Sequence, residues 1–224
     1  MSIWAVLAAA GRGERLGSDR PKAFARLGGR PLLAESLERL ESSEWIERIV
    51  IAAPPGWEEP SILVAEELAA GKVHAAVAGG ESRSESVRLA LAEVPEDAAA
   101  VLVHDAARPL LPEEVVERVL APLGEGWDGV VPAMPVPDTI KRVEGERVVE
   151  TLPRGELVAV QTPQAFVAAA LREALTSEVV GASDCASLVE ARGGRIKVVE
   201  GDRRLLKVTG VEDLALVESW LAHA

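Results

Sequence analysis

The fold class of this chain is decided by residues 8–22, AAAGRGERLGSDRPK. They follow an apolar run at residues 3–9, which is typical of a buried β-strand because it is short and uninterrupted. Three alanines and the glycines Gly11 and Gly13 have little or no side chain. A flat ligand can therefore approach the backbone, and the backbone N–H groups can face an anion. The stretch predicts a phosphate-binding loop at the end of a first strand.

The same loop is rich in positive charge, although the chain is acidic overall. The formal net charge of the chain is -12, whereas four cations stand against two acids between residues 12 and 22. A polyphosphate ligand explains this excess, because guanidinium and ammonium groups neutralise the charge that develops in phosphoryl transfer. A solvated basic loop at a strand end is the alternative. The cations are Arg12, Arg15, Arg20 and Lys22, and the acids are Glu14 and Asp19.

Two familiar phosphate loops fit these residues poorly. A P-loop needs a lysine between its last glycine and a serine or threonine, but Gly17 directly precedes Ser18. A dinucleotide-binding fingerprint needs G-x-G-x-x-G, but Gly11, Gly13 and Gly17 are spaced one residue too wide. The second expected strand also ends in proline instead of an acid. A nicotinamide-dependent oxidoreductase is therefore less favoured than an enzyme of phosphoryl transfer.

The rest of the chain alternates β-branched runs with amphipathic helical runs, which predicts an α/β sheet domain. A chain of 224 residues can bury one substantial core but is too short for two ordinary domains. We therefore expect a single domain over residues 1–224, a Rossmann-like three-layer sandwich with a mostly parallel central sheet. Strands are expected at residues 49–53, 73–78, 100–104, 129–133, 157–160 and 196–199, and helices around residues 33–40, from residues 86 and 113, and at residues 211–221.

Residues 134–156 interrupt this alternation. Two extended runs, at residues 139–143 and 147–151, flank a short segment that contains Gly145, which is typical of a β-hairpin. A two-stranded hairpin on its own is only marginally stable in water. We therefore expect a protruding hairpin arm at residues 133–156 that packs against its own domain or against a second subunit.

Composition and charge argue against several classes of partner and location. An excess of 36 acidic over 24 basic residues argues against general nucleic-acid binding. No run of about 18 uncharged apolar residues exists, so we expect no membrane span. The N-terminal apolar run has no basic lead and is not interpreted as a signal peptide. The single cysteine, Cys185, cannot form an internal disulfide, so we expect a buried, inert thiol in a reducing cytoplasm.

Three further segments give the loop a specific context. They are GGESRSES at residues 79–86, VHDAARP at residues 103–109, and LLKVT at residues 205–209, which is followed by Glu212 and Asp213. The first loop alone resembles the signature of nucleotidyltransferases. Together the four segments resemble the 2-C-methyl-D-erythritol 4-phosphate cytidylyltransferase family of the non-mevalonate isoprenoid pathway, over essentially the whole chain. Near the start of the chain two positions depart from the family pattern, since Ala8 stands for proline and Ala23 follows the lysine in place of glutamine.

This resemblance implies a reaction without a covalent enzyme intermediate. A phosphate oxygen of 2-C-methyl-D-erythritol 4-phosphate would attack the α-phosphorus of CTP, giving 4-diphosphocytidyl-2-C-methyl-D-erythritol and pyrophosphate, with Mg²⁺ as the cofactor. Catalysis would then consist of positioning and charge stabilisation. By the same resemblance, Arg15 and Lys22 would contact the triphosphate and Lys207 would orient the acceptor. The implied catalytic residues are Arg15, Lys22, Arg154 and Lys207.

The resemblance also implies the residues that bind CTP. Backbone groups of the first loop would recognise the pyrimidine, because the amino group of cytosine and the O4 of uracil differ in hydrogen-bond sense. The glycines at residues 79–80 are otherwise a plain turn after a strand. The implied CTP-binding residues are Ala9, Ala10, Gly11, Gly13, Gly80, Glu81, Arg83, Ser86 and Asp105.

Asp105 stands where an apolar strand is expected to end, which is where ligands bind in open α/β sheets. It would hold Mg²⁺ through water, because Mg²⁺ gives up water reluctantly. A helix N-cap before Ala106 is the alternative. His104 is expected to be structural, since a phosphate that is already ionised needs no base. The implied acceptor-binding residues are Asp105, Ala106, Arg108, Thr139, Arg154, Thr162, Ser183 and Lys207.

In the family that the chain resembles, the arm forms a homodimer and carries groups such as Thr139 and Arg154 to the acceptor site of the neighbouring subunit. Ser183 departs mildly from the family, which often has threonine there. Arg108 is a candidate for binding phosphate or for anchoring a loop. A cytidylyltransferase of the same fold acting on ribitol 5-phosphate is the nearest alternative, and a nucleotide-binding regulator without catalysis is a more distant one.

Overall fold

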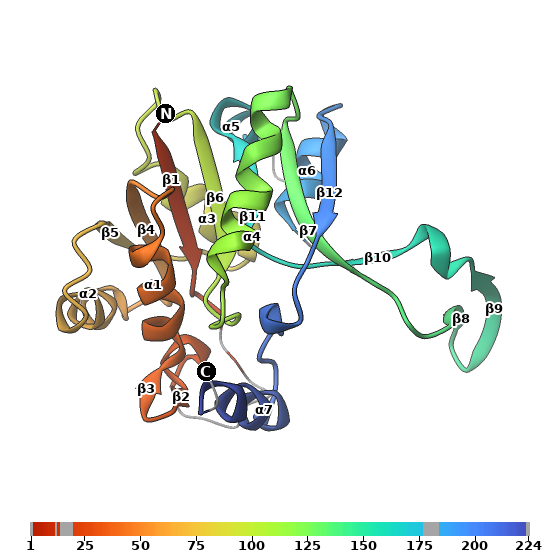
Figure 1. Cartoon of the computed structure of the whole chain (residues 1–224), viewed down its shortest axis with the longest axis horizontal. Helices are drawn as coiled ribbons and strands as arrows, with labels where there is room; N and C mark the ends of the chain where they lie inside the picture. The colour runs from red at the N-terminus through yellow and green to blue at the C-terminus, as the bar shows by residue number, and fades with distance from the viewer. Residues whose placement is uncertain (1, 12, 14–19, 177–183, 223–224) are drawn as a thin grey trace.

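The computed structural model describes residues 2–11, 13, 20–176 and 184–222. Within these residues, an eight-stranded sheet of order β10-β7-β11-β6-β1-β4-β5, with β12 paired to β7, forms the centre of the molecule (Figure 1). The strands are β1 (Ile3–Ala8), β4 (Arg48–Ala53), β5 (Val73–Ala78), β6 (Ala100–Asp105), β7 (Gly129–Pro135), β10 (Val158–Val160), β11 (Gln164–Val167) and β12 (Ile196–Glu200). All pairs are parallel except those made by β10 and β11. The expected α/β class with a mostly parallel sheet is confirmed.

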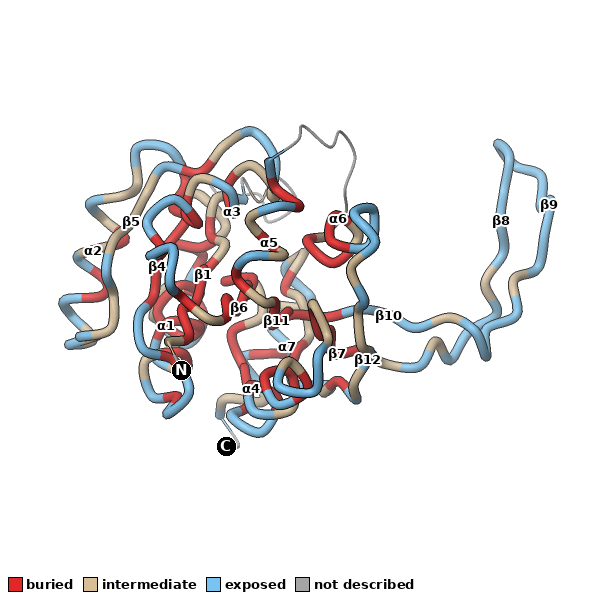
Figure 2. The backbone as a smooth tube through the Cα atoms, turned by 90° about the horizontal axis from the view of Figure 1, so that it is seen from above, coloured by how far each residue is buried: buried red, intermediate tan, exposed pale blue. Residues whose placement is uncertain are grey.

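Helices cover both faces of the sheet and complete the three layers. One hydrophobic cluster packs α1 (Leu32–Ser42), α2 (Glu58–Glu67) and α4 (Glu113–Leu120) on one face. A second cluster packs α3 (Arg83–Leu91), α5 (Ala168–Ala174) and α6 (Cys185–Ala191) on the other face. Strands β1 and β6 lie between these layers and are buried along nearly their whole length (Figure 2). Their uninterrupted apolar sequences follow from this burial on two sides.

Local sequence signals set the ends of several helices. Helix α3 begins at Arg83, three positions before the expected start, because the Ser82 hydroxyl accepts a hydrogen bond from the Glu85 N–H at 3.1 Å and acts as the N-cap. Helix α4 begins after Pro112 as expected, and its four apolar residues face the core. Helix α6 ends in a turn in which Gly193 has a φ of 83°. Gly193 and Gly194 thus form the turn by which the chain leaves this helix.

Strands β8 (Ile140–Glu144) and β9 (Arg147–Leu152) form an antiparallel hairpin of their own. Gly145 has a φ of 59° in its turn. The hairpin projects away from the sheet in both views (Figures 1 and 2). Its valines Val143, Val148 and Val149 are exposed. The predicted hairpin is therefore present, and its apolar side chains are left uncovered by the described part of the single chain.

The C-terminal helix α7 (Val211–Leu221) packs beside the short hairpin of β2 (Arg26–Leu27) and β3 (Arg30–Pro31) through a small apolar cluster. This packing brings the end of the chain to the segment that follows the first loop, as the Gly28 N–H shows by donating to Glu218 Oε1 at 3.1 Å. Among the described helices, none is long and apolar enough to cross a membrane. Short 3₁₀ segments lie at Lys22–Phe24, Ala121–Glu125, Arg154–Glu156 and Arg203–Leu205.

Candidate active site

A cavity of about 1190 Å³ opens beside the carboxyl ends of β1, β4, β5 and β6. Ligands of open α/β sheets bind at this edge, because the loops that follow parallel strands meet there. The first loop, the turn before α3, the end of β6 and the segment before α7 all contribute to its wall. The predicted site residues in the wall are Ala9, Ala10, Gly11, Gly13, Lys22, Gly80, Glu81, Arg83, Ser86, Asp105, Ala106 and Lys207.

The first loop doubles back so that Lys22 returns to the cavity. The Lys22 N–H donates to the Gly11 carbonyl at 3.4 Å. Gly13 has a φ of 70°, and a Cβ at this position would lie 2.6 Å from the Lys22 Cβ. Only glycine therefore fits where the loop closes. The predicted cation Arg15 lies outside the described residues, so its role remains a prediction.

The turn of residues 79–86 packs directly on the first loop. A Cβ at Gly79 would lie 2.3 Å from the Ala10 Cβ, so glycine permits the close approach. The Ser86 hydroxyl accepts from the Gly80 N–H at 3.1 Å and donates to the Ser82 carbonyl at 2.8 Å. These bonds fix the turn before α3 begins. The structure thereby brings together the two segments that were expected to hold the base.

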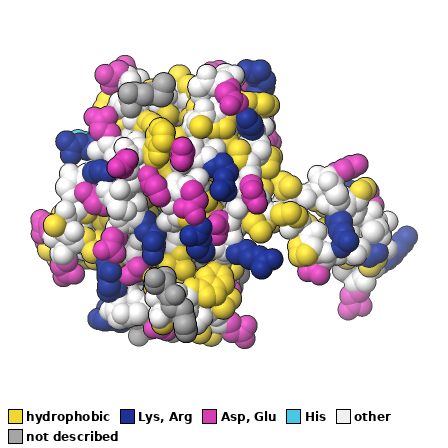
Figure 3. Space-filling view, in the orientation of Figure 1, with side chains coloured by type: hydrophobic (Ala, Val, Ile, Leu, Met, Phe, Trp, Pro, Cys, Tyr) yellow, Lys and Arg dark blue, Asp and Glu magenta, His cyan; other side chains and the backbone are white. Residues whose placement is uncertain are grey.

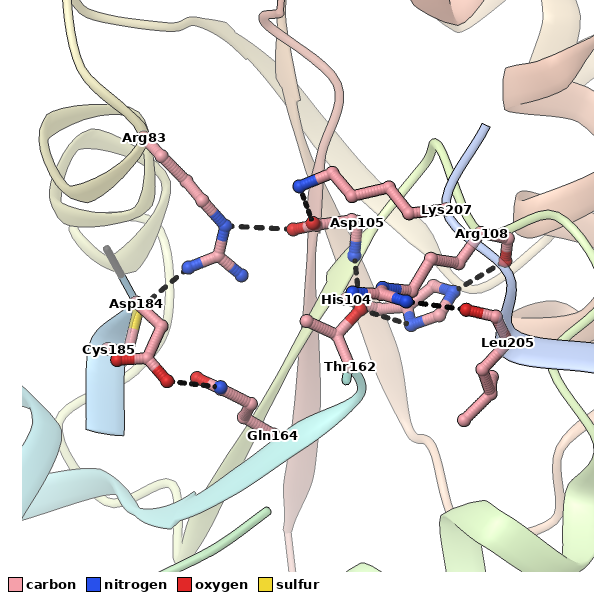
Figure 4. A network of polar contacts seen from close by, with 10 residues as sticks. All are labelled: Arg83, His104, Asp105, Arg108, Thr162, Gln164, Asp184, Cys185, Leu205 and Lys207. Carbon is pink, nitrogen blue, oxygen red and sulfur yellow. Dashed lines mark hydrogen bonds and ion pairs between the residues drawn. The ribbon is translucent and has the colours of Figure 1, made fainter. Parts of the chain in front are cut away.

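Asp105 is the last residue of β6 and carries two ion pairs. Its Oδ1 lies 2.8 Å from Arg83 Nε, and its Oδ2 lies 2.7 Å from Lys207 Nζ (Figure 4). A turn follows it, since the Arg108 N–H donates to the Asp105 carbonyl at 2.9 Å. The alternative of a helix N-cap is therefore wrong. The three charged groups come from strand β6, helix α3 and the segment before α7, so only the fold assembles them.

Burial and charge act in opposite senses on this cluster. Burial alone opposes the ionised form of Asp105, yet the positive charges of Arg83 and Lys207 hold its pKa well below the usual range. Burial likewise opposes the charge on Arg83, while Asp105 and the nearby Cys185 raise the pKa of its guanidinium above its usual range. Burial raises the pKa of the Cys185 thiol, which lies 3.5 Å from Arg83 Nη1. The carboxylate and the guanidinium are therefore both charged at neutral pH, and the thiol is buried as expected.

Thr162 and His104 lie behind Asp105, away from the cavity. The Asp105 N–H donates to Thr162 Oγ1 at 3.1 Å, and that oxygen lies 3.2 Å from His104 Nδ1. Burial lowers the pKa of His104 to about 4, so its imidazole is neutral at pH 7. The Arg108 side chain also faces inward and donates to the Leu205 carbonyl. Of the two roles considered for Arg108, the geometry supports loop anchoring.

The residues at this edge fit a cation that arrives with a phosphate ligand. No group of three or more His, Cys, Asp or Glu side chains in the described ranges is arranged to hold a metal ion by itself. Each Asp105 oxygen accepts one side-chain hydrogen bond and retains a further lone pair. One carboxylate, with phosphate oxygens and water supplying the other ligands, is the kind of donor set that Mg²⁺ uses in nucleotide sites.

Several predicted site residues do not line this cavity. Thr139 precedes β8, and Arg154 follows β9, where its side chain is exposed and donates to the Pro137 carbonyl. Neither residue lines the cavity of the same chain, and the hairpin beside them projects away from the sheet (Figure 1). Ser183 lies outside the described residues, and its role remains a prediction.

The cavity also has walls that were not predicted. Trp57 and the prolines Pro54 and Pro55 follow β4, and Thr209 follows Lys207. Thr209 lies inside the LKVT segment, so that motif was a usable signal. Nothing in the sequence singled out Trp57, because a tryptophan after a strand is more often part of the core.

Comparison with known proteins places the chain in a family. The model of the 2-C-methyl-D-erythritol 4-phosphate cytidylyltransferase family, IspD, matches residues 3–223. The 2-C-methyl-D-erythritol 4-phosphate cytidylyltransferase of Frankia casuarinae is 45% identical over 222 residues, which cover 99% of this chain and 82% of that protein. The protein of the same name from Streptomyces coelicolor is 44% identical, with 98% of this chain and 84% of that protein covered.

Solved structures agree with this assignment. The crystal structure of 2-C-methyl-D-erythritol 4-phosphate cytidylyltransferase from Thermus thermophilus has a TM-score of 0.78 and 34% identity, covering 100% of this chain and 99% of that one. A crystal structure of 4-diphosphocytidyl-2C-methyl-D-erythritol synthase has a TM-score of 0.83 and 31% identity, with 98% of both chains covered. The chain therefore belongs to the 2-C-methyl-D-erythritol 4-phosphate cytidylyltransferase family and is a nucleotidyltransferase.

Proposed function

We propose that this chain transfers CMP from CTP to 2-C-methyl-D-erythritol 4-phosphate and releases pyrophosphate, within the non-mevalonate isoprenoid pathway. The observation that carries the proposal is the meeting of Asp105 with Arg83 and Lys207 at a cavity whose other wall is the glycine loop and Lys22. That arrangement offers fixed positive groups to two phosphorylated ligands. The described residues that line the cavity include no catalytic triad with a protein nucleophile. It suits direct attack of one phosphate on another.

The two halves of the cavity suit the two halves of CTP. The triphosphate lies on the first loop, where Gly11, Gly13 and Lys22 present backbone and ammonium groups. The cytosine lies between Ala10 and the turn that begins at Gly79, whose small residues leave room for a flat ring. Arg15 would add a second cation to the triphosphate. Lys22 then neutralises charge on the phosphates as pyrophosphate leaves.

The acceptor approaches from the side of Lys207. Its phosphate is already ionised at neutral pH, so its oxygen attacks the α-phosphorus of CTP without a general base. The Lys207 ammonium orients this phosphate, while Asp105 holds the lysine in place through their 2.7 Å ion pair. Arg108 contributes indirectly, by anchoring the chain at the carbonyl of Leu205.

Mg²⁺ is the proposed cofactor, held by the triphosphate oxygens and, through water, by Asp105. When bound, it neutralises charge on the phosphates and orients them. The carboxylate suits this role because nearby positive charges keep its pKa low, so it stays ionised in the whole physiological range. Arg83 and Lys207 fix the direction of the two carboxylate oxygens of Asp105 by donating a hydrogen bond to each.

We further propose a homodimer formed through the arm at residues 133–156. Val158 and Val160 of β10, which pairs with the end of β7 that leads to the hairpin, are exposed, as is Val198 of β12. Hydrophobic atoms gather where the hairpin leaves the body (Figure 3). A second subunit that covers them would remove a patch that a monomer leaves in water. It would also bring Thr139 and Arg154 to the acceptor side of the partner's cavity.

The choice of acceptor is tested by the release of pyrophosphate from CTP in a coupled assay. We expect faster turnover with 2-C-methyl-D-erythritol 4-phosphate than with ribitol 5-phosphate, and a product whose ³¹P spectrum shows a diphosphate diester. Faster turnover with ribitol 5-phosphate would reverse the assignment, because the two reactions share their chemistry and differ in the acceptor pocket.

We place the protein in the cytoplasm, to which its single buried thiol is suited.

A further inference from the structure

Trp57 lines the cavity on the loop that follows β4. Strand β4 lies between β1 and β5 in the sheet, so this loop leaves the sheet between the first loop and the turn that begins at Gly79. The Gly79 N–H donates to the carbonyl of Ala53, the last residue of β4, at 2.8 Å. The loop of Trp57 is therefore attached to the wall that is proposed to hold the cytosine.

Hydrogen bonds fix the backbone of Trp57 on both sides. Its N–H donates to the Pro54 carbonyl at 2.8 Å and closes a tight turn. The central pair of that turn, Pro55 and Gly56, is one that a type II turn favours, and Gly56 has a φ of 80°. The Trp57 carbonyl accepts from the buried Ser61, from its N–H at 3.0 Å and from its hydroxyl at 2.7 Å. The indole is therefore carried by a backbone that these bonds hold in place.

The indole reaches the segment of Lys22 through Phe24. The centroids of the Trp57 and Phe24 rings lie 4.5 Å apart, with an angle of 45° between the ring planes. Aromatic rings at this distance attract each other. Phe24 belongs to the same 3₁₀ turn as Lys22, and the Ala25 N–H closes this turn by donating to the Lys22 carbonyl at 3.0 Å. A contact on the Phe24 ring therefore also fixes the backbone of Lys22.

The other contacts of this turn hold it from different directions. The Lys22 N–H donates to the Gly11 carbonyl at 3.4 Å, which is beyond the usual range of about 2.7–3.2 Å for such bonds. Ala23 and Phe24 pack into the hydrophobic cluster beneath α1, which supports the turn from within. Trp57 supports Phe24 from the side of the cavity, because the indole also lines the cavity wall.

We propose that Trp57 is a positioning residue that holds the turn of Lys22 at the cavity through Phe24, and so fixes where the Lys22 ammonium meets the triphosphate. This inference rests on the proposed function, in which Lys22 neutralises charge on the phosphates. Removing the indole leaves the turn without support on the cavity side. A displacement of about 1 Å in a positioned group lowers the rate by about a hundredfold.

Two substitutions of Trp57 test this role by steady-state pyrophosphate release. Trp57→Leu keeps an apolar side chain but removes the ring, and we expect its kcat to fall by about tenfold or more. Trp57→Phe keeps a ring against Phe24 and restores most of the rate. Trp45→Leu is the control, because Trp45 is 42% exposed and does not line this cavity. A native kcat in Trp57→Leu would overturn the proposal.

A double variant separates positioning from a general loss of structure. If Trp57 acts through Lys22, then Trp57→Leu combined with Lys22→Ala turns over no more slowly than Lys22→Ala alone, because the group that Trp57 positions is absent. Losses of kcat that multiply in the double variant would overturn the proposal. If Trp57→Leu does not fold, Phe24→Leu removes the same ring contact from the other side and enters the same comparison.

The same comparison is made for binding, by calorimetric titration with CTP and Mg²⁺. We expect Trp57→Leu and Lys22→Ala each to raise the Kd, and the double variant to bind no more weakly than Lys22→Ala. Independent losses of affinity in the double variant would contradict the proposal. If the native protein bound CTP but released no pyrophosphate with the acceptor, the proposed function would fail while the coupling in binding would stand.

Discussion

Lys22 illustrates how a single residue depends on its backbone setting. It reaches the cavity because the loop closes on itself, with Gly13 in a left-handed conformation against the Lys22 Cβ. A lysine at this place is a compact positive charge with three donors, which suits a group of phosphate oxygens. The sequence predicted this residue from its motif, but it could not predict the close approach that puts it beside the cavity wall.

The first prediction concerns Lys22→Ala. We expect turnover to fall by more than about a hundredfold, comparable to the loss of one oxyanion donor, because the charge on the leaving pyrophosphate is no longer neutralised. Steady-state pyrophosphate release measures the effect. Lys197→Ala is the matched control, since this lysine pairs with Glu125 on the surface and does not line the cavity. A near-normal rate in Lys22→Ala would contradict the role assigned to it.

The second prediction concerns the pH dependence of stability at Asp105. Its pKa is depressed in the folded state, so the ionised carboxylate contributes stability that is present above the unfolded pKa of 3.8 and is lost as pH falls through the folded value. In Asp105→Asn this contribution disappears and Arg83 loses the carboxylate with which it pairs. We expect a loss of about 3–5 kcal/mol at pH 7 and a shallower decline in acid.

Urea unfolding measured from pH 7 down to about pH 2 checks this prediction, because the contribution of Asp105 is lost only as pH falls below the unfolded carboxyl pKa of 3.8. Asp97→Asn is the control, because Asp97 is exposed in the loop before β6. An Asp105→Asn protein that is as stable as the native one at pH 7 would show that Asp105 is not a structural centre of the site.

At the scale of elements, the hairpin β8–β9 has sequence features that do not serve its own domain. Its valines face water and its two strands pair only with each other among the described elements. Arg154 stands just after it, remote from the cavity of the same chain. These features are explained together if the hairpin serves the acceptor site of a neighbouring subunit.

The third prediction is that Arg154→Ala weakens use of the acceptor while CTP binding survives. The loss of one charge-assisted contact lowers kcat/KM for the acceptor by about tenfold or more. Calorimetric titration with CTP and Mg²⁺ should give an unchanged Kd. Arg142→Ala is the control, since Arg142 lies in the hairpin and pairs with Glu150 on its surface. Equal loss of acceptor use and CTP binding would mean that the hairpin has only a structural role.

Elements with a complete local pattern were predicted, and elements that depend on partners were not. The strand Val73–Ala78 and the helix Val211–Leu221 have the expected bounds, because their apolar periods and flanking turns are local. Strand β11 (Gln164–Val167) was missed. It is four residues long and antiparallel, and it exists because it fits between β6 and β7. Helices α2, α5 and α6 were missed because their apolar stretches are short. These stretches form a buried helix face only where they pack against the sheet.

At the scale of the whole molecule, the exposed apolar patch at the base of the hairpin is the feature that bears on assembly with a second copy. Val158 of β10 and Val198 of β12, two strands that pair with β7, are 48% and 52% exposed, and Val148 in the hairpin is 54% exposed. An acidic chain with a net charge of -12 repels its copies, so apolar burial must outweigh this repulsion in a dimer.

The fourth prediction is therefore that the native protein sediments as a dimer and that Val148→Asp and Val158→Asp shift it toward monomer. A charge buried in an apolar interface without a partner is strongly unfavourable. Acceptor use should fall together with dimer content, while the affinity for CTP remains. Val211→Asp is the control, because Val211 is 62% exposed but lies at the start of α7. A native protein that stays monomeric at assay concentrations would exclude this arrangement.

The candidate site shows what a sequence can and cannot reveal about a whole molecule. The roles of Lys22 and Lys207 were predicted from the family resemblance that their motifs carry, and Asp105 was predicted also from its place at the end of an apolar strand. Their distances were not predictable, since they depend on the strand order and on the packing of α7 beside the segment that follows the first loop. The hydrogen bonds of His104 and Thr162 were not predictable either, because Thr162 lies in a segment between β10 and β11 that only the antiparallel pairing brings beside β6.

A crystal structure of the protein grown with CTP and Mg²⁺ tests the central claim most directly. We predict electron density for the triphosphate along Gly11, Gly13 and Lys22, with cytosine against Ala10 and Gly79 and the metal ion within reach of Asp105 through a water molecule. A nucleotide bound elsewhere on the chain, or an empty cavity at saturating CTP, would contradict it.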